Sequence, residues 1–464
     1  MPSSLPDFIT RLKNLGELQQ LDAPVSTRLE LAAIARKISS YPEGGPALLF
    51  HKPGDSPYPL AANLFGSRQR MQLALGVDHL SDLTGALAAL LCDLPINGMA
   101  GFGRLMSTHP ALRCCLPVVI PDGPCRETVE RLVDLERYPF PHNWPDDGSA
   151  AGTGHYITLG QVFTNDPDGG NPNCGIYRCQ IHGPQTLAIR WRQGSGAEQH
   201  LLQYRKQRTP MPVAIVLGGP PALTLTAAWP LPEGLDELQV AGWLRNSPIP
   251  VVHCPHGPLR VPAEAELVLE GFAEYDQELT EGPFGNHTGR YDPAGPAARV
   301  RITRITRRRS PIIPATVVGP PPQEDCWMML GWERLLAALL PKLVPNVREV
   351  CLPQPWVFRQ SAVIALEQHT PRVVREAVHQ LWQLPWFRKA RLLVLVDAAT
   401  APHNLQQVAW QVVNEADWLD DLIRDEAGGR LAIDATGRYT AAERLADEPT
   451  QHLIKQRWKE YGLP

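Results

Sequence analysis

Several marks of membrane-bound, exported and nucleic-acid-binding proteins are missing from this chain of 464 residues. It contains no uninterrupted apolar run of about eighteen residues, the length that a membrane span needs. Residues 1–21 contain no apolar stretch of the signal-peptide kind. There is no long Lys/Arg run and the formal net charge is -4, so nothing suggests a nucleic-acid surface. We therefore expect a cytoplasmic protein that binds neither a membrane nor nucleic acid.

The chain also lacks any Cys-x-x-Cys pair, and the adjacent Cys114 and Cys115 have a poor spacing for zinc. An odd number of cysteines without regular spacing favours reduced thiols in a cytosolic protein over a disulfide framework. The nine cysteines are Cys92, Cys114, Cys115, Cys125, Cys174, Cys179, Cys254, Cys326 and Cys351.

What is present is a chain too long for one ordinary core, so two or three domains are expected. The hydrophobic fraction of 44% is usual for a folded protein. The 47 prolines are dispersed, which indicates many turns and loops rather than a disordered tract.

The N-terminal part is predicted to be a small α/β unit over residues 1–110. Apolar spacing predicts a helix over residues 7–15 that ends at Gly16. Thr27 and Glu30 have the spacing of a capping box before a second helix. Short buried strands are expected over residues 46–50 and 59–63.

Strand-like segments separated by Gly, Pro and Asp turns dominate residues 111–318, as in an antiparallel sheet or barrel. They are residues 117–120, 156–159, 186–191, 212–217, 266–270 and 300–305. Residues 319–345 are predicted to link the domains through a buried helix, since residues 324–340 are apolar nearly all round. Strands and helices then alternate over residues 346–464, which predicts a second α/β domain with a partly parallel sheet. The fold class is therefore mixed α/β (α+β).

The most informative motif is the run Glu281-Gly282-Pro283-Phe284-Gly285, followed at once by Asn286 and His287. Gly-Pro fixes the backbone into a turn, and a stiff turn is a suitable place for a catalytic carboxylate. A solvated surface turn is the alternative for so short a motif.

A second polar cluster comprises residues 173–178 and 190–196, which we predict to lie on two paired strands. Arg178, Arg190 and Arg192 together with nearby glycines suit a phosphate group, although exposed arginines on a strand pair would give the same composition. Tyr177 and Trp191 are expected to flank a planar ring. Asn173 with a carboxylate could hold a hard divalent ion, and Glu233, Asp236 and Glu237 compete for that role.

At these residues the chain resembles the UbiD decarboxylase family, and the resemblance runs almost end to end. It is carried by short motifs in the right order. These motifs are Leu15-Gly16-Glu17-Leu18, Asp22-Ala23-Pro24-Val25, Gly45 to Phe50, Asn63 to Ser67, Tyr156-Ile157-Thr158, Asn173 to Arg178, Glu281 to Gly285, Pro320-Pro321 and Ile433-Asp434-Ala435-Thr436.

The resemblance implies reversible, non-oxidative decarboxylation of an aromatic, heteroaromatic or α,β-unsaturated carboxylic acid. It implies prenylated FMN supplied by a partner flavin prenyltransferase, a divalent metal (Mn²⁺ or Mg²⁺) and a monovalent cation (K⁺ or Na⁺). The implied fold is a split β-barrel cofactor domain, an N-terminal α/β unit, a linker helix and a C-terminal α/β domain that assembles homodimers or homohexamers. Which acid is the substrate, and in which direction the reaction runs, does not follow from the sequence.

The resemblance also assigns residues. Asn173 and Glu237 match the metal-binding positions, and Glu281 and Arg178 match the catalytic carboxylate and arginine. The segments that contact the cofactor correspond to Ile176, Tyr177, Arg178, Arg190, Trp191, Arg192, Ser195, Gly196 and Glu237. Arg391 falls where many members have a phosphate-contacting lysine, and an arginine there keeps the charge with a different hydrogen-bond geometry.

The chief departure is Asn286, which occupies the place of the family's second acid and has no acidic proton. Glu281 could then be the sole proton donor, which we favour, or His287 could serve, since imidazole titrates near neutral pH. The third alternative is a degenerate, non-catalytic protein that binds the prenylated flavin. An ordinary flavin reductase built on a split barrel is a further alternative. The chain has no evident Gly-x-Gly-x-x-Gly fingerprint for a nicotinamide cofactor, although such barrels need not have one.

Overall fold

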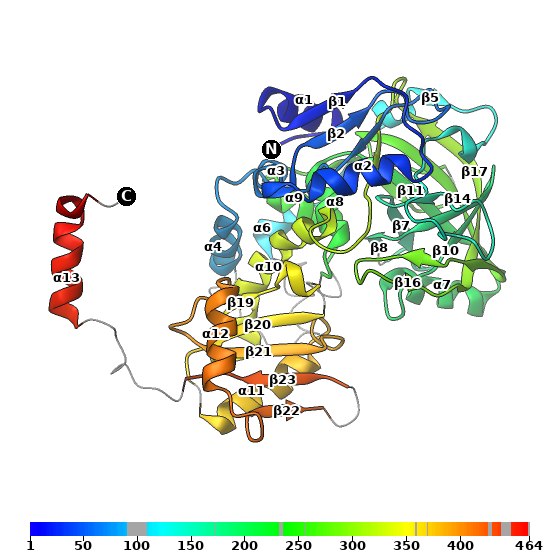
Figure 1. Ribbon diagram of the computed structural model, residues 1–464. Coiled ribbons are helices and arrows are strands. Elements are labelled where there is room, and N and C mark those ends of the chain that lie inside the picture. The colour runs from blue at the N-terminus through cyan, green and yellow to red at the C-terminus, as the bar shows by residue number, and fades with distance from the viewer. Residues whose placement is uncertain are drawn as a thin grey trace. The chain divides into compact units, whose positions relative to one another are not determined.

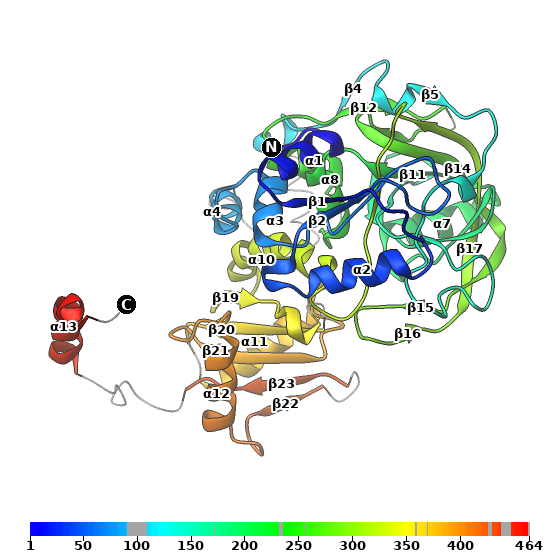
Figure 2. The same ribbon diagram turned by 45° about the horizontal axis from the view of Figure 1, so that its top comes forward.

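The structure is a computed structural model that describes residues 1–90, 109–170, 172–231, 235–255, 257–357, 360–368, 370–425, 429–437 and 447–462. The chain forms two compact units. One comprises Met1–Leu343 with Gln354–Phe358, and the other comprises Val344–Pro353 with Arg359–Pro464. Figures 1 and 2 give two views of the elements.

Three strands of the N-terminal segment and the later strand β18 form a four-stranded sheet in the order β1-β2-β3-β18. The pairs β1–β2 and β3–β18 are parallel, and β2–β3 is antiparallel. The strands are β1 (Leu18–Leu21), β2 (Ala47–Phe50), β3 (Leu60–Ala62) and β18 (Ile313–Ala315). The predicted strands near residues 46–50 and 59–63 are therefore β2 and β3.

Helices α1 (Leu5–Asn14) and α2 (Glu30–Ser39) are the two predicted helices of this segment. The predicted capping box of Thr27 is wrong, because the chain turns at Leu29 (φ 68°) and the helix begins only at Glu30. The Glu30 carboxylate accepts the backbone N–H of Ser26 at 2.7 Å instead.

A large antiparallel sheet in the order β6-β9-β10-β17-β14-β11-β7-β8, with β5 beside β17, forms the centre of the first unit and curls as half of a barrel (Figure 1). Its longest strands, β14 and β17, pair over most of their length. The strands are β5 (Thr128–Val129), β6 (Tyr156–Ile157), β7 (Gln161–Asn165), β8 (Pro172–Ile176), β9 (Cys179–Gly183), β10 (Thr186–Ile189), β11 (Met211–Gly218), β14 (Ala265–Glu281) and β17 (Gly295–Arg307).

The expectation that residues 173–178 and 190–196 lie on paired strands is wrong. β8 pairs with β7, and β10 pairs with β9 and β17. The reason is local: β7–β8 and β9–β10 are consecutive strands that pair with each other, and Tyr177 and Arg178 join β8 to β9. The two polar segments nevertheless approach each other, since a Cβ atom on Gly196 would lie 2.4 Å from Oδ1 of Asn173.

Two small sheets and several helices complete the first unit. Helix α10 (Glu324–Leu343) is buried along most of its length, as its apolar composition predicts. The small sheets contain β13 (Arg260–Pro262), β12 (Pro250–His253) and β4 (Val118–Val119), and β15 (Phe284–Gly285) with β16 (Tyr291–Asp292). The helices are α3 (Arg68–Leu75), α4 (Ser81–Leu90), α6 (Pro110–Arg113), α7 (Gly196–Gln207), α8 (Pro221–Ala228), α9 (Glu237–Leu244) and α10 (Glu324–Leu343).

The second unit is an α/β arrangement with a five-stranded sheet in the order β19-β20-β21-β23-β22. β20, β21 and β23 are parallel neighbours, which confirms the predicted partly parallel sheet. The elements are β19 (Val347–Cys351), β20 (Ser361–Leu366), β21 (Leu392–Asp397), β22 (Leu422–Arg424), β23 (Leu431–Asp434), α11 (Pro371–Gln383), α12 (Leu405–Glu415) and α13 (Glu448–Arg457).

The mixed α/β class with a split-barrel sheet is confirmed, while the division at residues 110, 318 and 345 stays a prediction. In the described part of the chain, no helix combines the length and apolar character that crossing a bilayer requires. The eight described cysteines are free thiols, and Cys92 lies outside the described residues.

Candidate active site

The site is centred on the turn that follows β14. Glu281 is the last residue of this strand and pairs with Gly295 on β17, which anchors its backbone in the sheet. Gly282 (φ 94°) and a cis Gly282–Pro283 bond then turn the chain into the β15–β16 hairpin. The sequence motif is therefore the junction between the large sheet and a short hairpin, and the side chain of Glu281 is fully buried there.

Arg178, in the link between β8 and β9, binds Glu281 through two nitrogens. Its Nε donates to Oε1 at 2.8 Å and its Nη2 donates to Oε2 at 3.0 Å. Its guanidinium also lies 4.6 Å from the centre of the Phe284 ring. A buried carboxylate needs this kind of paired, charge-assisted contact, and the sheet brings the two residues together across 103 positions of sequence.

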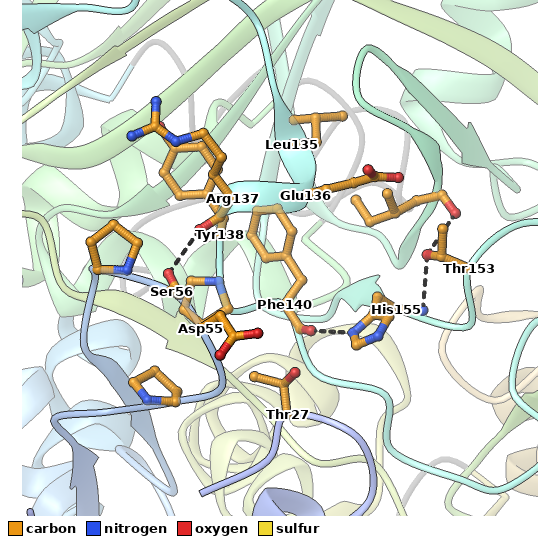
Figure 3. Close-up of a pocket in the computed structure, with 14 residues that line it drawn as sticks. Thr27, Asp55, Ser56, Leu135, Glu136, Arg137, Tyr138, Phe140, Thr153 and His155 are labelled. Atoms are coloured by element: carbon orange, nitrogen blue, oxygen red, sulfur yellow. Dashed lines mark hydrogen bonds between the residues drawn. The ribbon is translucent and has the colours of Figure 1, made fainter. Parts of the chain in front are cut away.

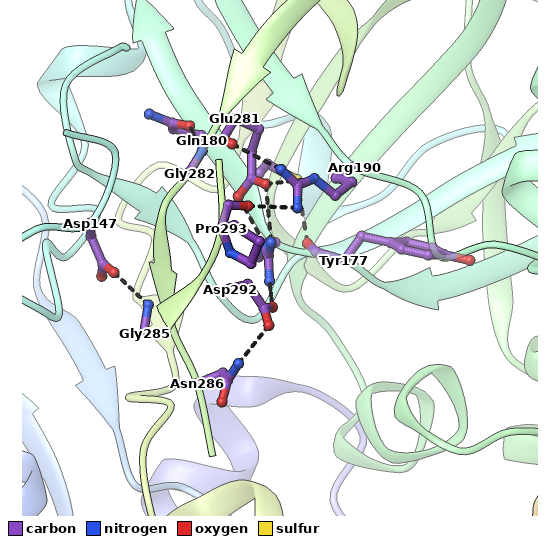
Figure 4. Close-up of polar contacts among 12 residues, drawn as sticks. Asp147, Tyr177, Gln180, Arg190, Glu281, Gly282, Gly285, Asn286, Asp292 and Pro293 are labelled. Atoms are coloured by element: carbon purple, nitrogen blue, oxygen red, sulfur yellow. Dashed lines mark hydrogen bonds and ion pairs between the residues drawn. The ribbon is translucent and has the colours of Figure 1, made fainter. Parts of the chain in front are cut away.

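Arg190 is the second cation beside Glu281 (Figure 4). Its Nε lies 3.1 Å from Oε2 of Glu281, and its Nη2 donates to the backbone carbonyl of the same residue at 3.0 Å. Its Nη1 donates to the carbonyl of Pro293, also at 3.0 Å. Two of the three arginines expected at a phosphate, Arg178 and Arg190, are thus engaged with Glu281.

Asp292 is a site residue that the sequence analysis missed. Nη1 of Arg178 donates to its Oδ2 at 2.6 Å, and the amide Nδ2 of Asn286 donates to its Oδ1 at 2.6 Å. The β15–β16 hairpin places Asp292 opposite Phe284. One signal was available, because a carboxylate six positions after Asn286 returns to the same end of a short hairpin.

Asp147 and Gln180 both fix the turn of residues 282–285 (Figure 4), and the sequence analysis did not identify either residue. Asp147 accepts the backbone N–H of Gly285 at 2.7 Å and that of Trp144 at 3.0 Å. Burial raises the pKa of Asp147 to about 6, against the opposing effect of these two N–H groups. Oε1 of Gln180 accepts the N–H of Gly282 at 2.9 Å. Hydrogen bonds to Asp147 and Gln180 therefore fix the turn that follows Glu281.

The predicted metal ligands Asn173 and Glu237 lie close together. Oε2 of Glu237, at the start of α9, accepts the backbone N–H of Cys174, the residue after Asn173, at 3.0 Å. Nδ2 of Asn173 lies 3.5 Å from Oγ1 of Thr164, which in turn lies 3.0 Å from Nδ1 of His200. An amide and a carboxylate are hard oxygen donors of the kind that Mn²⁺ and Mg²⁺ prefer.

The electrostatics of Glu237 suit a cation. Burial raises its pKa to about 8, and the neighbouring Asp236 adds to the shift. The side chain of Asp236 caps α9 by accepting the backbone N–H of Leu238. Asn173 and Asp236 also line a small pocket of about 10 Å³. Glu233, the third carboxylate considered, lies outside the described residues. A cation at this place would offset the cost of ionising Glu237, so the residues fit a hard metal ion.

The first segment assigned to the flavin follows Asn173 along the chain. Ile176 ends β8, and the rings of Tyr177 and Trp191 meet edge to face with centroids 5.2 Å apart. The two aromatics therefore contact each other and do not lie on either side of an open slot. The indole N–H of the buried Trp191 has no hydrogen-bond partner among the described residues. Such an orphan donor fits a polar ligand group.

Three further assigned residues lie at the start of α7. Ser195 caps this helix by accepting the N–H of Glu198, and Gly196 is its first residue. Arg192, just before them, is exposed. A helix N-terminus with a nearby arginine suits an anion such as a phosphate. Arg391 lies in the second unit, directly before β21, where its N–H donates to the carbonyl of Gln360 at 2.7 Å. Its role stays a prediction.

A cavity of about 540 Å³ opens elsewhere in the first unit (Figure 3). Among the described residues that line it, none is an assigned site residue. Its wall includes Asp55, Glu136 and His155, whose Nδ1 lies 2.6 Å from the carbonyl oxygen of Phe140. The arginine–carboxylate cluster therefore defines the candidate active site, and this cavity lies outside it.

The described site thus combines a curled sheet, a buried carboxylate bound by arginine, and hard oxygen donors from β8 and the start of α9. Such an arrangement is suited to acid–base chemistry on a split-barrel sheet. Comparisons with known proteins place the molecule in a family.

The chain belongs to the UbiD family. Models of the 3-octaprenyl-4-hydroxybenzoate carboxy-lyase match it in three parts: the N-terminal domain over residues 9–90, the Rift-related domain over residues 118–321 and the C-terminal domain over residues 326–440. An uncharacterized protein of Archaeoglobus fulgidus is 32% identical over 454 residues, covering 94% of this chain and 92% of its own length.

Solved structures show the same relationship. The UbiD-class enzyme HmfF from Pelotomaculum thermopropionicum, in an evolved dimeric form with prFMN, has 26% identity and a TM-score of 0.81, with coverage of 97% of this chain and 98% of its own. The vanillic acid decarboxylase of Sedimentibacter hydroxybenzoicus, at 24% identity, shares the fold over 100% of both chains with a TM-score of 0.86. The predicted family, fold and enzyme class, a carboxy-lyase, are confirmed.

Proposed function

We propose that this enzyme catalyses the reversible, non-oxidative decarboxylation of an aromatic, heteroaromatic or α,β-unsaturated carboxylic acid with prenylated FMN. The observation that carries the proposal is the fully buried Glu281 held by two nitrogens of Arg178 at the end of β14. The similar HmfF structure contains prFMN. The similar vanillic acid decarboxylase is named for an aryl acid substrate.

When bound, the prenylated flavin supplies a sink for the electron pair left behind by carbon dioxide. The chain supplies orientation and a proton. Arg178 holds Glu281 as a carboxylate in the resting arrangement, because its guanidinium bonds both oxygens. If the guanidinium turns to the substrate carboxylate, the Glu281 carboxyl group is free to carry the proton that the reaction needs. The proton on Glu281 then passes to the carbon that lost carbon dioxide, so one proton replaces one carboxylate.

Asn173 and Glu237 would hold the divalent metal, Mn²⁺ or Mg²⁺, and a monovalent cation, K⁺ or Na⁺, would accompany it. The start of α7 and the exposed Arg192 would face the phosphate of the flavin. A flavin prenyltransferase would supply the cofactor. A cytoplasmic location and assembly into a homodimer or homohexamer stay predictions from the sequence.

A non-catalytic protein that merely binds the prenylated flavin is the alternative, and it rests on Asn286 in the place of an acid. The carboxylate of Asp292, bonded to both Asn286 and Arg178, weighs against this alternative, because the site retains two carboxylates. Retention of the Asn173–Glu237 oxygen pair weighs against it as well.

The test is an assay of protein co-produced with a flavin prenyltransferase and supplied with Mn²⁺ and K⁺. Release of carbon dioxide from at least one member of a panel of aryl, heteroaryl and enoic acids is expected. Glu281→Gln, which keeps the shape of the side chain, should abolish release. Flavin-loaded wild-type protein that releases none from any acid of the panel would favour the non-catalytic alternative.

A further inference from the structure

We infer that Asp292 is the second acid of the active site and that Asn286 serves to orient it. The inference rests on the proposed decarboxylase function and goes beyond the sequence pattern, which assigned this place to position 286. Asp292 acts through Arg178, so we describe it as a positioning residue for the guanidinium that binds Glu281.

The first observation concerns the hydrogen-bond partners of the three guanidinium nitrogens of Arg178. Nε and Nη2 donate to Glu281, whereas Nη1 donates to Oδ2 of Asp292 at 2.6 Å. One guanidinium therefore bridges two carboxylates that lie on the two sides of the Gly282–Pro283 turn. Because each nitrogen has its own partner in this arrangement, the planar fork of arginine sets the directions of three hydrogen bonds, which a lysine could not reproduce.

The second observation is the difference in burial between the two acids. The side chain of Glu281 is 0% exposed, whereas that of Asp292 is 42% exposed. Glu281 has a second cation in Arg190, so the cluster contains two guanidinium groups and two carboxylates. When Glu281 carries a proton, the positive charge of Arg178 is still balanced by the carboxylate of Asp292. Asp292 thus keeps Arg178 in the site while Glu281 alternates between its two protonation states.

The third observation explains why residue 286 is an amide. Its Oδ1 accepts the backbone N–H of Thr288 at 2.8 Å, and its Nδ2 donates to Oδ1 of Asp292 at 2.6 Å. A carboxylate at position 286 could accept from Thr288 but has no N–H for Asp292. It would place two negative charges against each other, which disfavours ionisation of both. An acid at position 286 would therefore harm this site.

The inference is tested with Asp292→Asn and Asn286→Asp in protein co-produced with a flavin prenyltransferase, using the best acid of the panel. The matched control is Glu278→Gln. Glu278 lies on the same strand, β14, as Glu281, and its exposed carboxylate pairs with Arg205 of α7. We expect each site variant to lower kcat by about tenfold or more while KM changes less, since misplacement of an orienting group acts mainly on the transition state. Glu278→Gln should stay near the wild type.

A second readout uses the protein without cofactor. The thermal midpoints of Asn286→Ala, Asp292→Ala and the double variant should be non-additive, because the two side chains share a hydrogen bond. Additive shifts, a faster Asn286→Asp enzyme, or Asp292→Asn indistinguishable from Glu278→Gln would each overturn the inference. If the wild type releases no carbon dioxide from any acid, the proposed function fails, while this cycle still decides whether Asn286 orients Asp292.

Discussion

Arg178 and Glu281 form a two-point contact, with Nε–Oε1 at 2.8 Å and Nη2–Oε2 at 3.0 Å, and the carboxylate side chain in it is fully buried. The contact joins the β8–β9 link to the end of β14, so the curled sheet is what creates it. Its geometry depends on a planar fork with several donors, and this dependence leads directly to a substitution test.

Arg178→Lys should lower kcat/KM by about 10²-fold, because an ammonium keeps the charge but cannot satisfy Glu281 and Asp292 in the same directions. Steady-state decarboxylation kinetics measure the loss. Arg205→Lys is the control, since Arg205 forms a single exposed contact with Glu278 at 2.8 Å. Equal effects of the two substitutions would show that the fork geometry at Arg178 has no special role.

Glu281→Gln should abolish incorporation of deuterium at the vacated carbon when the reaction runs in D₂O, whereas His287→Ala should leave it largely intact. The amide has no acidic proton to give, and His287 lies in the hairpin turn beyond Asn286. Mass spectrometry of the product reports the label. If His287→Ala alone removes the label, the donor is His287 and the assignment of Glu281 is wrong.

Glu237 should make the stability of the metal-free protein depend on pH. Its pKa is raised, chiefly by burial, from 4.5 to about 8, so the folded state favours the neutral carboxyl. Its contribution to stability is therefore complete below about pH 4.5 and is lost as the pH rises through about 8. Thermal midpoints of the wild type should fall over this range more than those of Glu237→Gln.

Metal should reverse this loss. At pH 8 we expect added Mn²⁺ to raise the midpoint of the wild type, and to raise those of Glu237→Gln and Asn173→Ala much less, because a ligand stabilises the state that binds it. Identical pH profiles for wild type and Glu237→Gln, together with the same response to Mn²⁺, would remove this pair of residues from the metal site.

Gly285→Ala should destabilise the protein by about 1–3 kcal/mol, as overpacking of a well-packed site does. A Cβ atom at this position would lie 2.0 Å from Cδ2 of Trp144, whose backbone N–H is bonded by Asp147. Gly85→Ala in α4 is the control, because a Cβ there meets nothing within 4 Å. Denaturant unfolding should show a loss for Gly285→Ala and a small gain for Gly85→Ala.

The sequence predicts much of the fold because apolar periodicity is a local signal. It finds β2, β3 and α10 from their own residues. It fails where the outcome depends on which strands become neighbours, as with residues 173–178 and 190–196, which lie on strands that do not pair with each other. The capping box at Thr27 fails for another reason, since the turn at Leu29 delays the helix.

The candidate site divides in the same way. Glu281, Arg178, Asn173 and Glu237 were assigned through the family resemblance of their motifs, and their roles stay predictions. Asp292 could not be assigned in this way, because its role depends on the β15–β16 register that places it opposite Phe284. Asn286 replaces an acid in the sequence motif, and only the folded hairpin shows that its amide donates a hydrogen bond to Asp292.

Mass spectrometry of the cofactor released from purified protein, co-produced with a flavin prenyltransferase, tests the central claim most directly. We predict the mass of prenylated FMN in amounts close to one per chain, and a clear reduction in Glu237→Gln. Protein that is folded but contains no flavin under these conditions would contradict the account.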